Sequence, residues 1–226
     1  AGTTVKLTIK RNGSVLTIDV ARAKISLKAV SGSIHKNTKL GIITITSFSR
    51  GVAQSFLDTV NSLVAQGARG LVIDLRNNPG GFLDEVVSML NNYVPKGSKI
   101  LSTKYGDKST EMVFSTGPGN LADIKTTILV NRGTASASEI FAGVLQDYGM
   151  AKIIGAQTFG KGTVQQLLNY GDGSSFKVTI AKWLTANDMD IEKVGITPDI
   201  KIADDETTTL TDEVLEKGLQ EILNEL

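Results

Sequence analysis

Two serines lie in a run of small residues, NRGTASASEIFAGVLQD, between an apolar stretch and a pattern typical of an amphipathic helix. A serine hydroxyl attacks a carbonyl carbon only when a neighbouring base takes its proton. Histidine is the usual base, but the chain has one histidine and no cysteine. That histidine, His35, lies in a polar stretch far along the chain from Ser136 and Ser138. The sequence therefore argues against a Ser-His-Asp triad and leaves open which group would activate a serine.

Lysine is the alternative base, and Lys161 lies between two glycines in the stretch QTFGKG. A lysine takes a proton only when its amine is neutral, which requires a pKa lowered from about 10.4 to near 7–8. Burial against apolar side chains lowers the pKa of an amine, and Phe159 and Val164 are the candidate neighbours. Because most lysines are solvated, the flanking glycines alone are a weak indication of catalysis.

Ser136 also has a purely structural interpretation, because the stretch SASE that it begins matches the capping box at a helix start. Helix caps are common, so this motif alone favours capping over catalysis by roughly three to one. The two roles are compatible, since the free N–H groups at a helix start can hold the oxyanion formed during attack. The amide of Ala137 would be one donor, and Gly80 or Gly81 of the turn RNNPGG would supply a second.

The apolar pattern predicts a mixed α/β fold with βαβ units that position these loops. An uninterrupted apolar run predicts a strand at 70–75, an apolar stretch predicts another at 126–130, and a short strand is expected at 151–156. These strands are followed by RNNPGG, NRGTAS and QTFGKG. If the strands are parallel, the three glycine-rich loops meet at the carboxyl edge of one sheet, where open α/β sheets bind ligands. The helix at 137–149 and the strand after it have similar lengths, so we expect Lys161 to return to the level of Ser136.

The remaining elements are predicted from alternation and helical periodicity. Asn12-Gly13 predicts a hairpin turn, 24–30 a further alternating strand and the polar stretch 31–39 a loop. We also expect a strand at 40–48, a helix over 52–64 capped by Ser49, a helix over 83–94, hairpins around Gly106-Asp107 and Gly171-Asp172-Gly173, and a final helix opened by Thr211.

Composition limits the classes of function. The 226 residues carry 24 Lys+Arg, 23 Asp+Glu and 5% aromatic residues, which argues against nucleic acid or a charged membrane surface as the main partner. The absence of cysteine excludes disulfides and thiolate zinc sites. No apolar run approaches about 20 residues, the length of a membrane-spanning helix. The first strand pattern starts at the first residues, so we expect the chain to be part of a longer protein.

Taken together, VIDLRNNPGG, NRGTASASEIFAGVLQD and TFGKGTVQQ, with DGSSFKVTIAKWLT and GITPDI after them, closely resemble the C-terminal processing (tail-specific) serine peptidases. The resemblance spans about residues 40–202, in the family's order, and reverses the preference for capping alone. It implies the following roles: Ser136 as the nucleophile, Lys161 as the general base, Gln165 as the residue that positions the lysine, and the amides of Ala137 and of Gly81, in preference to Gly80, as oxyanion donors.

One implied contact is geometrically difficult. In a straight strand Lys161 and Gln165 would be about 13 Å apart. The chain must therefore bend at Gly162-Thr163 for the two side chains to meet. If 161–166 is a regular strand instead, our hypothesis is that the site assembles only in an active conformation.

The resemblance also implies a Clp protease/crotonase-like core over 23–226, with 1–22 as the C-terminal strands of a truncated PDZ domain, a domain that binds peptide C-termini by β-augmentation. The implied partners are protein or peptide substrate C-termini, and no nucleic acid, metal or cofactor is expected. Membrane anchoring would need a segment absent from this chain, and a homodimer is left open. Bacterial members act in the cell envelope, periplasm or outside the cell, so we expect this location.

The sequence thus predicts a serine endopeptidase that cleaves unfolded proteins near their C-termini through a Ser-Lys dyad and an acyl-enzyme. Two alternatives stay open. A crotonase-like acyl-CoA enzyme would use the same oxyanion amides without needing Ser136 and Lys161 together. A peptide-binding scaffold with an inactive site would bind protein tails without cutting them.

Overall fold

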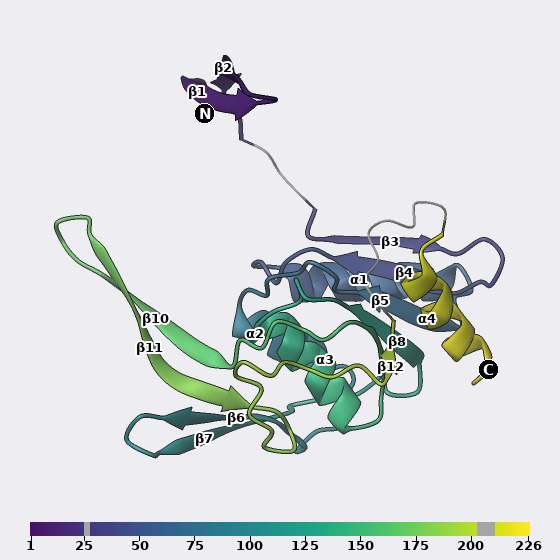
Figure 1. The fold of residues 1–226 in the computed structure, drawn as a ribbon. Helices are drawn as coiled ribbons and strands as arrows, with labels where there is room; N and C mark the ends of the chain where they lie inside the picture. The colour runs from purple at the N-terminus through teal and green to yellow at the C-terminus, as the bar shows by residue number, and fades with distance from the viewer. Residues whose placement is uncertain (25–27, 203–210) are drawn as a thin grey trace.

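The computed structural model describes residues 1–24, 28–202 and 211–226, and its centre is a six-stranded sheet (Figure 1). The strand order is β12 (Ile200–Lys201), β9 (Lys152–Gly155), β8 (Lys125–Val130), β5 (Gly70–Asp74), β4 (Gly41–Ile45) and β3 (Val30–Ile34). Neighbouring strands are parallel except β3, which is antiparallel to β4. The predicted mixed α/β fold is confirmed, and the strands before the three glycine-rich loops are parallel.

Helices cover both faces of this sheet. They are α1 (Val52–Ala65), α2 (Leu83–Leu90), α3 (Ala137–Asp147) and α4 (Glu213–Leu223). On one face Ile73 packs in a core with Phe56 of α1 and Phe141 of α3. On the other, Val72 packs with Leu219 of α4. Adjacent strand residues point to opposite faces, so two covered faces explain the uninterrupted apolar runs. Within the described ranges, no helix is long and apolar enough to span a membrane.

A second sheet contains two hairpins from the chain downstream of α2. Its order is β10 (Thr163–Asn169), β11 (Ser175–Leu184), β6 (Lys99–Tyr105) and β7 (Thr110–Phe114), and all neighbours are antiparallel. The β10–β11 hairpin extends away from the helices in Figure 1. β1 (Thr4–Arg11) and β2 (Ser14–Ala21) pair with each other through the predicted turn. The predicted hairpins are therefore confirmed.

The prediction of a loop over 31–39 is wrong for 31–34, because β3 extends to Ile34 and pairs with β4, whereas 35–39 form the turn between the two strands. β3 is an edge strand whose residues after Val30 are at least partly exposed, so its polar sequence is indistinguishable from that of a loop. Residues 25–27 of the strand predicted at 24–30 lie outside the described residues. His35 follows β3, and its Nδ1 lies 2.9 Å from the hydroxyl of Thr38.

Two predicted helix caps are also corrected. The N-cap of α1 is Gly51 rather than Ser49, and the carboxylate of Glu85 accepts hydrogen bonds from the N–H groups of Gly51 at 2.7 Å and Ala53 at 2.9 Å. A carboxylate from α2 thus accepts hydrogen bonds from the free N–H groups at the start of α1, and local sequence does not reveal this contact. α4 is capped by Asp212, one residue after the predicted position.

Candidate active site

One cleft of 310 Å³ is lined by residues from all three glycine-rich loops. The predicted residues on its wall are Gly81, Ser136, Ala137, Lys161 and Gln165, whereas Gly80 does not line it. The parallel strands β5, β8 and β9 deliver these loops to the same edge of the sheet, as the sequence predicts. In the described part of the chain, no group of three or more histidine, aspartate or glutamate side chains could hold a metal ion.

Ser136 lies directly before α3 with φ 58° and ψ −119°. This backbone conformation costs a residue other than glycine about 1–3 kcal/mol and is typical of functional sites, such as the strained turn that presents a nucleophilic serine between strand and helix. Ser136 is partly exposed. Ser138 is fully buried, and its hydroxyl donates to the carbonyl of Asn78 at 3.1 Å. Of the two serines, Ser136 is therefore the one that a substrate can reach.

The two predicted oxyanion glycines differ in what their N–H groups contact. The N–H of Gly80 donates to the side-chain oxygen of Asn78 at 2.9 Å, so it is already used. Within the described residues, the N–H groups of Gly81 and Ala137 have no acceptor. Gly80 lies against the start of α3, since a Cβ added to it would be 2.8 Å from the nitrogen of Ala137. Gly81 and Ala137 therefore offer two free amide donors beside Ser136.

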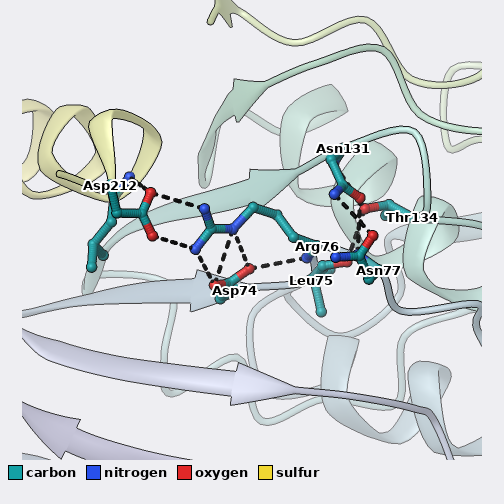
Figure 2. A network of polar contacts seen from close by, with 8 residues as sticks. Asp74, Leu75, Arg76, Asn77, Asn131, Thr134 and Asp212 are labelled. Atoms are coloured by element: carbon teal, nitrogen blue, oxygen red, sulfur yellow. Dashed lines mark hydrogen bonds and ion pairs between the residues drawn. The ribbon is translucent and has the colours of Figure 1, made fainter. Parts of the chain in front are cut away.

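Figure 2 shows how the loops that carry these donors are held together. The side-chain oxygen of Asn131 accepts from the N–H of Asn77 at 2.9 Å, and its NH₂ group donates to the side-chain oxygen of Asn77 at 3.0 Å (Figure 2). The hydroxyl of Thr134 donates to the carbonyl of Leu75 at 2.8 Å. Because both ends of these bonds are in the loops, the network fixes the two amide donors relative to each other.

Figure 2 also shows the contacts that connect the end of β5 to the C-terminal helix α4. The guanidinium of Arg76 donates to Asp74 at 2.6 Å and to both oxygens of Asp212 at 2.9 and 2.8 Å. Burial favours a higher pKa for Asp212, but the hydrogen bonds from Arg76 and from the N–H of Leu215 outweigh it and hold the pKa below its ordinary value. The position of α4 is therefore coupled to the turn that contains Gly81.

We expect Asp212→Asn to lower the free energy of unfolding by about 1 kcal/mol at pH 7, because asparagine keeps the helix cap but loses the charge opposite Arg76. A depressed pKa stabilises the fold above the unfolded value of 3.8, and this contribution is lost as the pH falls below it. Urea unfolding of parent and variant at pH 7 and pH 3 measures this. Asp19→Asn in the exposed Lys6–Asp19 pair is the control and should change little. An equal loss at both pH values would contradict the assignment.

The backbone of Lys161 is held from two sides. Its N–H donates to the carboxylate of Glu139 at 2.9 Å, and its carbonyl accepts from the indole N–H of Trp183 at 3.1 Å. Val164 and Trp183 line the cleft beside the lysine, as expected for Val164. The expectation that Phe159 buries the lysine is wrong, because Phe159 is 65% exposed and does not line the cleft.

Gln165 lies on β10, which begins at Thr163 after Lys161. The pairing of β10 with β11 shifts in register between Val164 and Gln165, so 161–165 is not a regular strand. Gln165 lines the same cleft as Lys161, but the structure records no hydrogen bond between their side chains among the described residues. Its role in positioning the lysine stays a prediction.

The comparison with known proteins defines the class. The model of peptidase family S41 matches residues 39–202, so the chain belongs to peptidase family S41. A probable CtpA-like serine protease of Staphylococcus haemolyticus is 43% identical over 203 residues, which are 89% of this chain and 40% of the relative. The carboxy-terminal processing protease CtpA of Bacillus subtilis is 40% identical over 201 residues, 88% of this chain and 43% of the relative. The chain thus spans about two fifths of the length of these relatives.

Solved structures agree with this class. The photosystem II D1 C-terminal processing protease matches with a TM-score of 0.74 and 27% identity, covering 97% of this chain and 60% of that protein. A lipoprotein from Streptococcus agalactiae matches with a TM-score of 0.67 at 19% identity, covering 88% and 71%, and shows the shared fold alone. The predicted family, the C-terminal processing serine peptidases, is confirmed.

Proposed function

We propose that this chain is the proteolytic core of a C-terminal processing endopeptidase and cuts unfolded protein tails through a Ser136–Lys161 dyad. The observation that supports this most directly is the single cleft lined by Ser136, Lys161 and the two free amides of Gly81 and Ala137. Membership of peptidase family S41 supports a hydrolase.

In the first half of the reaction, the neutral amine of Lys161 takes the proton of the Ser136 hydroxyl while the oxygen attacks the peptide carbonyl carbon. The carbonyl oxygen becomes an oxyanion, which the N–H groups of Gly81 and Ala137 stabilise. The ammonium of Lys161 then gives its proton to the leaving amine. The C–N bond breaks, and the ester of Ser136 with the substrate remains.

In the second half, a water molecule takes the place of the released amine. Lys161 accepts a proton from the water as its oxygen attacks the ester carbonyl, and the same amides hold the second oxyanion. Collapse of this intermediate returns the proton to Ser136 and releases the new carboxyl terminus.

The cleft also suggests how a substrate is held. β10 is an edge strand, and Thr163, Val164 and Gln165 at its start line the cleft. An edge strand pairs with an added extended peptide through its free backbone groups. We infer that the tail lies as an extended strand beside the turn that contains Gly81. Apolar walls that include Ile140 favour small apolar side chains next to the scissile bond.

The test is to incubate the parent chain with an unfolded peptide tail and with a fluorophosphonate that labels activated serines. We expect cleavage of the tail and covalent mass on the peptide that contains Ser136. Ser136→Ala should abolish both signals. Ser138→Ala is the matched control and should keep the label, because the hydroxyl of Ser138 is buried.

The outcomes separate the alternatives. Labelling of Ser138, or cleavage that survives Ser136→Ala, would rule out the proposed nucleophile. A parent chain that binds tails without cutting or labelling would favour the peptide-binding scaffold. Hydrolysis of an acyl-CoA thioester without peptide cleavage would favour the crotonase-like enzyme.

Three further assignments stay predictions and follow from the family. Residues 1–22, which contain the β1–β2 hairpin, would be the C-terminal strands of a PDZ domain, and 23–226 a core related to Clp protease and crotonase. The location would be the cell envelope or outside the cell.

A further inference from the structure

A buried carboxylate connects the loop of the nucleophile to the loop of the base. Glu139 of α3 is fully buried and does not line the cleft. Its Oε2 accepts from the N–H of Ser136 at 2.8 Å and from the N–H of Lys161 at 2.9 Å. Its Oε1 accepts from the hydroxyl of Thr158 at 2.5 Å and from the N–H of Gly160 at 2.7 Å.

Capping of α3 does not account for this arrangement. A capping box needs one bond from Glu139 to the N–H of Ser136, and that bond is present. The other three donors all belong to residues 158–161, the segment that delivers the lysine. Burying a carboxylate is unfavourable unless its oxygens accept hydrogen bonds, and here the base loop supplies most of them.

We propose that Glu139 is a positioning residue that sets the placement of the nucleophile relative to the base, an inference that rests on the proposed function. Because one oxygen binds both N–H groups, the backbone nitrogens of Ser136 and Lys161 lie within about 6 Å of each other. A displacement of about 1 Å between two reacting groups can lower the reaction rate about 100-fold. Glu139 does not line the cleft, so it acts through the two residues that it holds.

A second connection between the loops makes the proposal testable without loss of the fold. The N–H of Phe159 donates to the carbonyl of Thr134 at 3.0 Å, independently of Glu139. Trp183 also holds the carbonyl of Lys161. Loss of the hydrogen bonds to Glu139 should therefore leave residues 158–161 in place, but the backbone N–H groups of Ser136 and Lys161 would lose their acceptor.

The experiment is the Glu139→Gln variant in the intact chain. Glutamine has nearly the same shape, but one of its two oxygens becomes an NH₂ group that faces N–H donors. We expect kcat for a tail peptide to fall about 30- to 100-fold, with KM changed less than about threefold. The rate of fluorophosphonate labelling at Ser136 should fall by the same factor as kcat, because labelling reports activation of the serine without peptide binding.

Asp199→Asn is the matched control. Asp199 is also a carboxylate that accepts from a backbone N–H, that of Ile153 at 2.7 Å, and from the side chain of Gln146 at 2.8 Å. It does not line the cleft, so its loss should lower stability but leave kcat and labelling unchanged. If Glu139→Gln does not fold, Glu139→Asp decides instead. It keeps the charge but is shorter by one methylene group, and it should lower kcat and labelling with KM unchanged.

The inference is overturned if the folded variant at Glu139 keeps the parental kcat and labelling rate, or if KM alone changes. An inactive parent, or a parent whose activity survives Ser136→Ala, would instead overturn the proposed function. The two failures therefore give different results in the same set of measurements.

Discussion

Replacing Lys161 with methionine should lower kcat for a tail peptide by about 10²- to 10⁴-fold, with KM changed less than about threefold. Methionine keeps most of the apolar stem of the lysine but has no amine to take the proton of Ser136. The lysine backbone is held by Glu139 and Trp183, so the loop should keep its place. Initial rates followed by mass spectrometry, together with the melting temperature, measure the effect.

Lys177→Met is the matched control, because Lys177 also lines the cleft but has no role in the proposed proton transfer. Its kcat should stay within a few-fold of the parent. Parental activity in Lys161→Met, or an equal loss in Lys177→Met, would rule out Lys161 as the base.

Ser136 can be replaced in two ways that separate catalysis from backbone strain. Both Ser136→Ala and Ser136→Gly should lose cleavage by at least about 10³-fold, since neither side chain can form the ester. Their stabilities should differ, because Ser136 has φ 58° and only glycine adopts such a conformation without strain. We expect Ser136→Gly to be more stable than Ser136→Ala, with a free energy of unfolding higher by about 1–2 kcal/mol. Urea unfolding measures this difference.

This comparison has a built-in control. Ser138→Gly changes a serine inside α3, where glycine is unfavourable by about 1 kcal/mol, so it should be less stable than Ser138→Ala. The order of stabilities should thus reverse between the two serines. The same order at both positions would mean that the backbone of Ser136 carries no strain.

The sequence predicts the position of the site because the site depends on strand direction. Apolar runs at 70–75, 126–130 and 151–156 are strong strand signals, and covered parallel strands place the following loops at one edge. That geometry brings Lys161 to the level of Ser136, and both residues line one cleft. The short edge strand β3 lacks such a signal, since its exposed residues follow no apolar pattern.

The contacts that hold the site together could not be predicted, because each joins residues distant in the sequence. The side chains of Asn77 and Asn131 are 54 positions apart, and either asparagine alone resembles an ordinary turn residue. Glu139 shows the same limit. Its capping pattern is visible in the sequence, but its bonds to Gly160 and Lys161 depend on the return of the following strand. Local patterns therefore identify the site residues, and tertiary packing determines their support.

Among the described residues, α4 is the only helix that contributes to the smaller of the two cores, which Val72, Leu129 and Ile154 form on their side of the sheet. A chain shortened before Asp212 would expose the apolar side chains of these strands as one continuous surface. It would also remove one of the two carboxylates that pair with Arg76. Such a surface promotes self-association. Truncation at the C-terminal end should therefore yield insoluble material rather than a shorter folded chain.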